Sequence, residues 1–295
     1  MRIKLFHNES AGDEAHSREN LTKLIEKQGF KVEYASIKEK GWEDIDPKFD
    51  ILAVAGGDGT VRKLVKKLLE RKIIEKTFPI GILPLGTANN IHRFINKETD
   101  EKAIIKSWKT GKLKNFDIGL IENFDKNNFF LEGMGYGAFP ALIRRMKMHD
   151  DTGFEPEEML KIALHHLYRI VGSYKPKSAK IFIDGKDFSG EYIMVEVVNI
   201  PSIGPNLQLA SNALADDQQF NIVLIPETER KNLLSYIQNK IQGRESDPVF
   251  PQIHGKNIEI EWSGTDCHVD DKLIDGKQFP KIDISVRPSA ISFIA

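Results

Sequence analysis

The sequence predicts an α/β domain with a parallel sheet, followed by a mainly antiparallel β domain. Up to about residue 115, short apolar strands alternate with amphipathic helices, the pattern of parallel sheets with right-handed crossovers. Beyond residue 116, segments with alternating apolar and polar residues dominate. A chain of 295 residues also favours two domains, because single hydrophobic cores stop growing near this size. We therefore expect domains over residues 1–115 and 116–287.

Four strands and two helices account for the first domain. Residues 3–6 and 31–35 are short strands, and the helix between them carries Leu21, Leu24 and Ile25 on one face. Residues 49–55 are almost continuously apolar, as expected for a strand buried on both faces, and residues 78–83 form the next strand. A helix joins these two strands, since apolar residues recur there at helical spacing: Val61, Leu64, Val65, Leu68 and Leu69.

The second domain contains two hairpin signals and one or two helices. Residues 116–121 can pair with 128–131, and residues 180–184 with 192–199 around the turn Asp184-Gly185. Helical patterns cover residues 138–147 and 156–170, and further alternating strands lie at residues 220–225, 257–262 and 281–286.

Composition narrows the function and the location. The net charge of −1 argues against a nucleic-acid partner, because such proteins usually carry a strong basic excess. The single cysteine, Cys267, provides neither a disulfide framework nor a cysteine zinc site, which fits a cytoplasmic protein. The N-terminus lacks the pattern of a signal peptide, and no apolar run reaches the roughly 20 residues of a membrane span. We therefore expect any membrane contact to be peripheral.

The sharpest motif is Gly56-Gly57-Asp58-Gly59-Thr60, between a buried strand and an amphipathic helix. Glycines let the backbone turn tightly and approach a ligand, and a helix N-terminus favours phosphate. Asp58 fits a phosphate site if a cation such as Mg²⁺ lies between its carboxylate and the phosphate. Thr60 can cap the helix or donate to a phosphate oxygen. The simpler interpretation is a tight turn with Thr60 as the N-cap.

A second polar loop follows the next strand. It reads Pro84-Leu85-Gly86-Thr87-Ala88-Asn89-Asn90 and leaves the carboxyl end of a parallel strand, where ligands of open α/β sheets collect. Gly86 permits the turn, and Thr87 and Asn89 supply polar groups. Alone it is a helix-capping loop, but with residues 56–60 it predicts a nucleotide crevice built from two loops.

The two loops together resemble the catalytic domain of diacylglycerol kinases, sphingosine kinases and bacterial soluble lipid kinases; NAD kinases share only the first motif. The segment at residues 8–12 resembles the family's opening loop, with Glu9 in place of a proline. The resemblance implies ATP and Mg²⁺ as cofactors, with Asn8 and Ser36 beside the nucleotide. It also implies a C-terminal β-sandwich domain, after which residues 288–295 return to the first domain.

A loop at residues 213–220 resembles one that holds a structural Mg²⁺ in bacterial members of the family. The carried-over carboxylate ligand is Asp217, and Leu214 and Gln219 would offer backbone carbonyls. Gln218 replaces the family's glycine. The alternative is a polar turn without metal, since one carboxylate with carbonyls is a weak magnesium site.

The segment Val269-Asp270-Asp271-Lys272 falls where the family carries Asp-Gly-Glu, whose glutamate is the base for the lipid hydroxyl. Asp270 matches, but Lys272 occupies the glutamate position, and a lysine is mostly protonated at neutral pH. Asp271 is the adjacent carboxylate. A second acidic segment, Asp275-Gly276-Lys277, also ends in lysine.

These features give two main hypotheses and a third, an NAD-kinase-like enzyme, against which residues 84–90 and the acidic segment near residue 270 count. The first is an ATP- and Mg²⁺-dependent kinase for a hydroxyl of a diacylglycerol-like or sphingoid lipid, in which Asp58, Asp270 and Asp271 are catalytic. The second is a nucleotide-binding relative without kinase activity, motivated by Lys272. The partner in the first case is a lipid, and a homodimer is compatible with the sequence. A basic cluster at Arg144, Arg145 and Lys147 could meet an anionic membrane surface.

Overall fold

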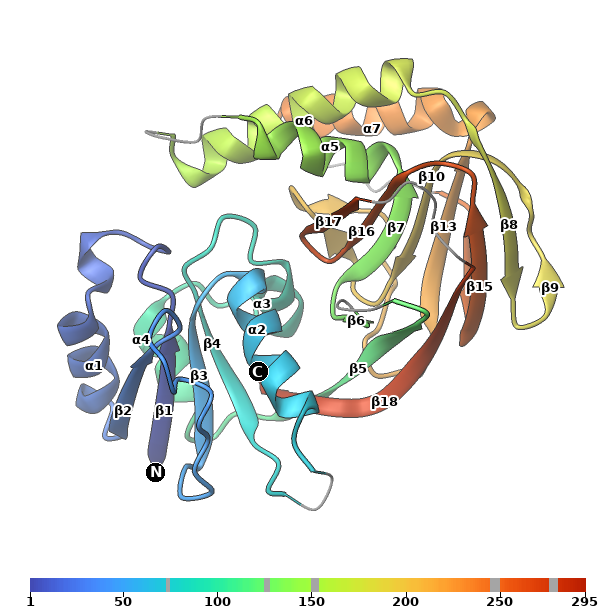
Figure 1. Ribbon diagram of the computed structural model, residues 1–295. Helices are drawn as coiled ribbons and strands as arrows, with labels where there is room; N and C mark the ends of the chain where they lie inside the picture. Colours follow the sequence, from blue (N-terminus) through green and yellow to red (C-terminus); the bar gives the residue numbers. More distant parts are fainter. Residues whose placement is uncertain (73–74, 125–127, 150–153, 245–249, 276–280) are drawn as a thin grey trace. The chain divides into compact units, whose positions relative to one another are not determined.

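The computed structural model describes residues 1–72, 75–124, 128–149, 154–244, 250–275 and 281–295 (Figure 1). It consists of two compact units. Unit 1 comprises Met1–Phe116 and Ser289–Ala295, and unit 2 comprises Asp117–Pro288. We describe each unit by itself.

Unit 1 is built on a parallel sheet, as the sequence predicts. The strand order is β2 (Lys31–Ser36), β1 (Arg2–His7), β3 (Ile51–Gly56) and β4 (Pro79–Pro84), and the end of β18 (Ile282–Ile294) pairs in parallel with β4. Every residue of β3 is buried, because helices cover both faces of a central parallel strand. The carboxyl ends of β1, β3 and β4 therefore lie together at one edge.

The helices of unit 1 are α1 (Arg18–Lys27), α2 (Asp58–Leu69), α3 (Asn90–Ile95) and α4 (Glu101–Ser107), with a 3₁₀ turn at Glu14–His16. The interpretation that Thr60 is the N-cap of the helix after β3 is wrong. Helix α2 begins at Asp58 with Gly57 as its N-cap, so Thr60 lies inside the first turn and does not cap the helix.

Unit 2 is an antiparallel β-sandwich, as the resemblance implies. Its strands are β5 (Leu113–Glu122, which starts in unit 1), β6 (Phe129–Phe130), β7 (Gly133–Gly137), β8 (Lys177–Ile183), β9 (Lys186–Asp187), β10 (Gly190–Val198), β11 (Ser202–Ile203), β12 (Leu207–Gln208), β13 (Phe220–Pro226), β14 (Gln252–Gly255), β15 (Asn257–Trp262), β16 (Asp266–Val269), β17 (Lys272–Asp275) and the start of β18. The hairpin of β5 and β6 is confirmed. The turn Asp184-Gly185 joins β8 to the short β9, because two residue pairs close that hairpin before β10 begins. The antiparallel pairing of β8 with β10 is present, but it joins residues 177–179 to 190–192 and not 180–184 to 192–199.

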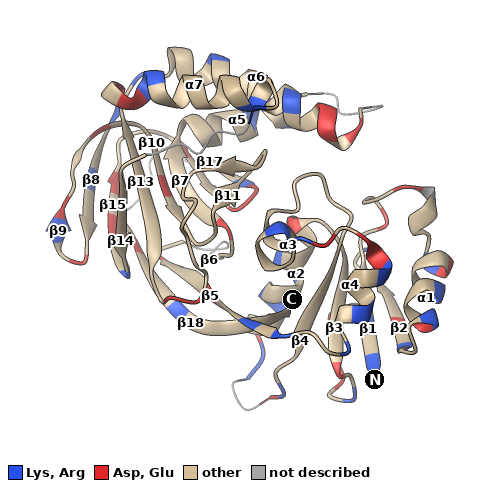
Figure 2. Ribbon diagram, turned by 180° about the vertical axis from the view of Figure 1, so that it is seen from behind, with Lys and Arg blue, Asp and Glu red and all other residues tan. Residues whose placement is uncertain are grey.

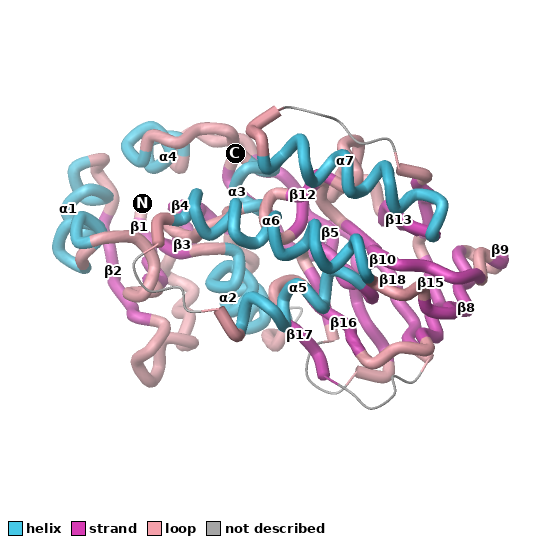
Figure 3. Tube along the Cα trace, turned by 90° about the horizontal axis from the view of Figure 1, so that it is seen from above, coloured by secondary structure: helices cyan, strands magenta, loops and turns pink. Residues whose placement is uncertain are grey.

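Three helices lie side by side over strands of unit 2 (Figure 3). They are α5 (Ala138–Lys147), α6 (Pro156–Ser173) and α7 (Arg230–Ile241), and a 3₁₀ turn at Glu227–Glu229 precedes α7. Sequence reasoning missed α7, since only three of its residues are buried and its apolar stripe is correspondingly weak.

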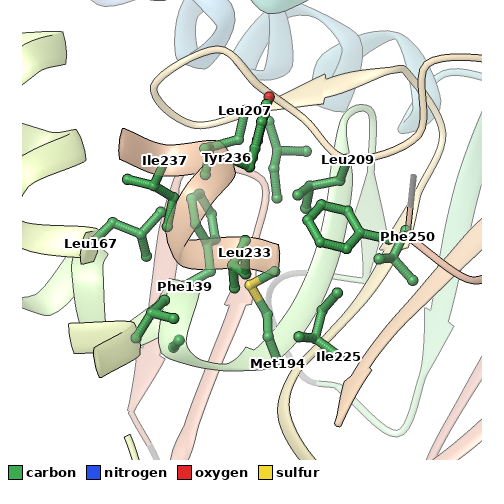
Figure 4. Packing of buried hydrophobic residues seen from close by; sticks show 14 of the residues in the cluster. Phe139, Leu167, Met194, Leu207, Leu209, Ile225, Leu233, Tyr236, Ile237 and Phe250 are labelled. Atoms are coloured by element: carbon green, nitrogen blue, oxygen red, sulfur yellow. The ribbon is translucent and has the colours of Figure 1, made fainter. Parts of the chain in front are cut away.

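The core under these helices is packed around Leu233 of α7 (Figure 4). Leu233 is fully buried in one cluster with Leu167 from α6, Phe139 from α5 and Met194 from β10. Tyr236 joins the same cluster, and its hydroxyl accepts a hydrogen bond of 2.8 Å from the amide of Gln208. Apolar burial thus fixes the helices to the sheet.

A carboxylate–imidazole pair is buried within unit 2. Glu196 Oε2 of β10 lies 2.7 Å from His268 Nε2 of β16, and both side chains are inaccessible to solvent. His268 Nδ1 lies 2.8 Å from the carbonyl oxygen of Asp270, which can only accept, so Nδ1 carries a proton. The second contact therefore holds one further proton, shared between Glu196 and Nε2. Burial raises the pKa of Glu196, and the Glu196 carboxylate raises the pKa of His268 against the opposing effect of burial.

We expect Leu233→Ala to lower the free energy of unfolding by about 2–5 kcal/mol, because it leaves a cavity in a closed core. Leu234→Ala, at the partly buried neighbour on the same helix, is the matched control and should cost clearly less. Urea denaturation of both variants measures the difference. Equal losses would show that Leu233 does not occupy the centre of this core.

The buried pair predicts a pH dependence of stability. A group whose pKa is raised in the folded state stabilises the protein below its unfolded pKa, and this stability is lost as the pH rises through the folded value. The free energy of unfolding should therefore fall as the pH rises above about 6.5, the ordinary pKa of histidine. In Glu196→Gln the amide of Gln can donate to the neutral ring of His268, so no shared proton is needed. The decrease of the free energy of unfolding above about pH 6.5 that comes from this pair should then disappear.

Urea denaturation across neutral to alkaline pH compares the wild type with Glu196→Gln. Glu191→Gln, at an exposed position of the same strand, is the control and should keep the wild-type slope. Parallel slopes in the wild type and Glu196→Gln would contradict the shared proton.

Candidate functional site

Three loops meet at the carboxyl edge of the sheet in unit 1. They are residues 8–12 after β1, residues 56–60 after β3 and residues 84–90 after β4. The amide of Asn8 donates to the Ala55 carbonyl (3.0 Å), and the amide of Gly12 donates to the Leu85 carbonyl (3.1 Å). The amide of Leu85 donates in turn to the Gly56 carbonyl at 3.2 Å. Backbone hydrogen bonds therefore join all three loops.

The second and third loops touch at two glycines. A Cβ atom on Gly86 would lie 2.4 Å from Gly57 Cα and 2.8 Å from Asn89 Oδ1. A Cβ atom on Gly57 would lie 3.0 Å from Gly86 Cα. Real Cβ atoms do not approach backbone atoms so closely, so only glycine fits at position 86. The backbones of the two glycines form a cradle, and the lack of a Cβ atom at both positions favours the close approach of a phosphate.

Asp58 links the same two loops through its carboxylate. Its Oδ2 accepts from the Asn90 amide (2.9 Å) and its Oδ1 from the Ile91 amide (3.0 Å), at the start of α3. These are two of the amide groups that a helix start leaves without an intrahelical acceptor. Asp58 is therefore a structural cap for α3.

Asn89 shapes the third loop from within. It adopts a left-handed conformation with φ of 51°. Its Oδ1 accepts from the Gly86 amide (2.9 Å), and its Nδ2 donates to the Gly86 and Pro84 carbonyls at 2.6 and 3.3 Å. These contacts make Asn89 a support for the loop, whereas the neighbouring Thr87 is exposed and open to a ligand.

The other residues that we predicted to lie beside the nucleotide differ in how far they are exposed to solvent. Ser36 is buried at the end of β2 and accepts from the amide of Lys38 at 3.3 Å. Thr60 is buried against Gly56, and Gly59 lies in the first turn of α2. The side chain of Asn8 accepts from the Ser10 amide at 3.4 Å.

Sequence reasoning missed two groups at this edge. Lys38 donates to Ser10 Oγ at 2.6 Å and so places a cation on the first loop. His7 is buried at the end of β1; burial lowers its pKa, and its Nδ1 lies 3.0 Å from the Tyr34 hydroxyl. Lys38 could have been found from the sequence, because it is a basic residue only two positions after the predicted site residue Ser36. Nothing local distinguishes His7.

A cavity of about 470 Å³ borders the third loop at Pro84 and Asn89. Helix α3 and the chain after it contribute the cations Arg93 and Lys97 to its lining. Arg93 Nε donates to the Ala88 carbonyl at 3.1 Å, which fixes the arginine beside the loop. The spacing of four residues between the two cations is the signal that could have pointed to them.

In unit 2, Asp270 lies in the tight turn between β16 and β17. It is only 6% exposed and has a φ of 52°. Its Oδ1 accepts from the amides of Leu131 (3.0 Å), Glu132 (2.8 Å) and Gly133 (3.4 Å). Three amide donors around one oxygen stabilise the ionised carboxylate and hold the turn against the segment between β6 and β7.

Asp271 is the exposed carboxylate of that turn, and Lys272 begins β17 opposite Val269. Asp270 and Asp271 are thus adjacent but differ in environment, since one is enclosed by amides and the other is open to solvent. Of the second acidic segment, Gly276 and Lys277 lie outside the described residues.

The predicted metal loop is held by its own hydrogen bonds. Asp217 Oδ1 accepts from the Gln219 amide (3.0 Å), and Gln218 has a φ of 62°, the conformation that explains the family's glycine there. The buried Asp117, which sequence reasoning missed, accepts from the Gln218 amide at 2.8 Å. Leu214 is 53% exposed. Among the described residues, no cluster of three or more His, Cys, Asp or Glu could hold a metal.

Two family models match the chain. The diacylglycerol kinase catalytic domain matches residues 2–121, and the YegS C-terminal NAD kinase beta sandwich-like domain matches residues 148–295. A diacylglycerol kinase of Staphylococcus saprophyticus is 24% identical over 299 residues, which cover 95% of this chain and 90% of that protein. A diacylglycerol kinase of Staphylococcus aureus (strain Newman) is 24% identical over 245 residues, covering 79% and 72%.

Solved structures share the fold. A diacylglycerol kinase structure from Bacillus anthracis has a TM-score of 0.74 at 21% identity, covering 99% of this chain and 96% of that one. An NAD kinase from Archaeoglobus fulgidus in complex with ATP has a TM-score of 0.52 at 12% identity, covering 100% and 94%. In the described part of the chain, no helix is long and apolar enough to cross a membrane. The chain belongs to the diacylglycerol kinase family of lipid kinases, with a kinase catalytic domain followed by a YegS-type β-sandwich domain.

Proposed function

We propose that the protein is an ATP- and Mg²⁺-dependent kinase that phosphorylates a hydroxyl of a diacylglycerol-like or sphingoid lipid. The observation that carries the proposal is the contact between Gly57 and Gly86 at the N-terminus of α2. A twelve-residue helix presents amide donors and the positive end of its dipole there, beside two glycines that carry no Cβ atom.

The nucleotide side of the proposal rests on unit 1. Gly57, Gly59 and Thr60 would hold phosphate oxygens, and Thr87 with Lys38 would line the same edge. Asp58 would bind Mg²⁺ through its carboxylate, since carboxylate oxygens are the ligands that Mg²⁺ prefers. Bound MgATP would supply the transferable phosphoryl group and neutralise its charge, and the protein would contribute position and electrostatic stabilisation.

The acceptor side rests on unit 2. Asp271 is the exposed carboxylate of the turn, so it is the group that can accept the proton of a lipid hydroxyl. Asp270 would position Asp271, because the three amides that surround it fix the turn. The Asp217 loop, with Leu214 and Gln219, remains a candidate for a structural Mg²⁺ whose role would be to hold unit 2.

The second candidate is a nucleotide-binding protein without phosphoryl transfer. It is favoured by Lys272, which puts a cation where the family has its base. A panel of lipids incubated with labelled ATP separates the two, since the kinase labels a lipid and the binding protein labels none. If Lys272→Glu labelled a lipid and the wild type labelled none, the second candidate would be supported.

Gly86→Ala should weaken ATP binding about 100-fold, because a displacement of about 1 Å between the two loops spoils the cradle. Isothermal titration with MgATP measures the effect. Gly172→Ala in α6 is the matched control, since a Cβ atom there meets no atom within 4 Å. If a folded Gly86→Ala protein bound MgATP with unchanged affinity, the nucleotide would not be bound at this cradle.

Asp271→Asn should lower kcat for the lipid by about 100-fold or more, the usual contribution of a general base, and leave the KM for ATP unchanged. Glu122→Gln, at another exposed acid of unit 2, controls for charge and should keep full activity. Full activity in Asp271→Asn would exclude Asp271 as the base and leave the nucleotide assignment intact.

A further inference from the structure

The buried pair of Glu196 and His268 has no part in the chemistry proposed above. The two residues lie two strands apart, because β7 runs between β10 and β16. In the register of the sheet, Gly135 of β7 lies opposite Glu196 on one side and opposite His268 on the other. A Cβ atom on Gly135 would lie 2.2 Å from Glu196 Oε2. The glycine therefore lets the carboxylate cross β7 and reach the imidazole.

The surroundings of this pair offer it little compensation for burial. The strand between the two residues, β7, carries no charged side chain (Figure 2). The ring of Phe139 lies edge-on to His268 at 4.6 Å, and Glu196 Oε1 is buried without a hydrogen-bond partner within the described part of the chain. Apolar residues of similar volume often stabilise a protein as well as a buried ionic pair does, whereas a buried polar pair can fix one arrangement of the chain. The pair is therefore to be explained by what it holds in place.

The pair holds the backbone of the acidic turn. His268 Nδ1 donates to the Asp270 carbonyl at 2.8 Å, and Glu196 fixes the other side of the ring at 2.7 Å. Asp270 has a φ of 52°, a conformation that an aspartate keeps only while its surroundings hold it there. Its carbonyl belongs to the peptide bond that leads to Asp271. The direction of this carbonyl therefore sets the direction in which Asp271 leaves the turn.

We propose that Glu196 and His268 are positioning residues for Asp271. They fix the peptide bond that joins it to Asp270, and thereby direct the exposed carboxylate. The inference rests on the proposed function, because it takes Asp271 as the base for the lipid hydroxyl. Neither residue of the pair touches the lipid, since both side chains are inaccessible to solvent. They act through the backbone, and a displacement of about 1 Å at a catalytic group can slow a reaction about 100-fold.

Two variants of the full chain separate position from stability. Glu196→Met/His268→Phe replaces the pair with apolar side chains of similar volume, so urea denaturation at neutral pH should find it no less stable than the wild type. Its kcat should nevertheless fall by about 10- to 100-fold with an unchanged KM for ATP, because the Asp270 carbonyl has lost its donor. Glu196→Gln should keep the wild-type kcat, since its amide can donate to the ring and hold it in place. The substrates are diacylglycerol and sphingosine, each dispersed in detergent, with labelled ATP.

Hydrogen exchange of the backbone gives a second measurement that does not depend on activity. The amide of Asp270 donates to the Gly133 carbonyl at 2.8 Å, so its exchange rate reports the order of the turn. In Glu196→Met/His268→Phe this exchange should be about tenfold faster, the equivalent of one lost hydrogen bond, and in Glu196→Gln it should be unchanged. The amide of Phe188, which donates to the Ile181 carbonyl at 2.8 Å, lies in another part of unit 2 and should exchange at the wild-type rate in both variants.

Glu191→Met, at an exposed position of β10, is the control variant and should match the wild type in every measurement. If the double variant does not fold, Glu196→Met alone should show a smaller change in the same direction, because it removes only the partner that orients the ring. Wild-type exchange of the Asp270 amide in these variants would overturn the proposal, and so would faster exchange with an unchanged kcat. If the wild type labelled no lipid, the proposed function would fail, and the exchange of the Asp270 amide would still decide whether the pair holds the turn.

Discussion

The contact between Gly57 and Gly86 is the constraint on which the site of unit 1 depends. It lets the loops after β3 and β4 approach to backbone distance, where no other residue fits at position 86. Only at this distance can the Asp58 carboxylate reach the first amides of α3, and only then does the Leu85 amide meet the Gly56 carbonyl. A glycine pair and one carboxylate thus convert two separate loops into a single rigid surface.

Unit 2 reaches a comparable rigidity by burying polar groups. The turn that carries Asp271 is fixed on one side by the amides around Asp270 and on the other by His268, whose ring is held by Glu196. An unpaired charge in that place would be costly, and the shared proton removes most of the cost. The exposed acid therefore stands on a turn that is held internally through Asp270 and His268.

Most of the architecture could be predicted because it follows from local patterns. The apolar run of β3 and the helical spacing of the apolar residues after it are both visible in neighbouring residues of the sequence, so neither depends on knowing the tertiary structure. The start of α2 was misplaced since Gly57 caps the helix without a side chain, so the sequence carries no capping signal there. The contact of Asp58 with α3 spans more than 30 residues. Likewise, Lys38 joins the site from the turn after β2, and His7 joins it from the end of β1. Such partners are chosen by tertiary packing, which a local pattern does not encode.

Strand β18 is shared between the units: its start pairs with β15, and Ser292 and Phe293 pair with β4. Phe293 also packs edge-on against Phe116 at 5.2 Å. The strand that covers the edge of β4 is thus translated after the whole of unit 2. During synthesis β4 stays an open edge, and open edges invite pairing with other chains. The parallel sheet of unit 1 therefore cannot be completed until residues 292–293 have been synthesised, and the edge of β4 stays unpaired until unit 2 has emerged.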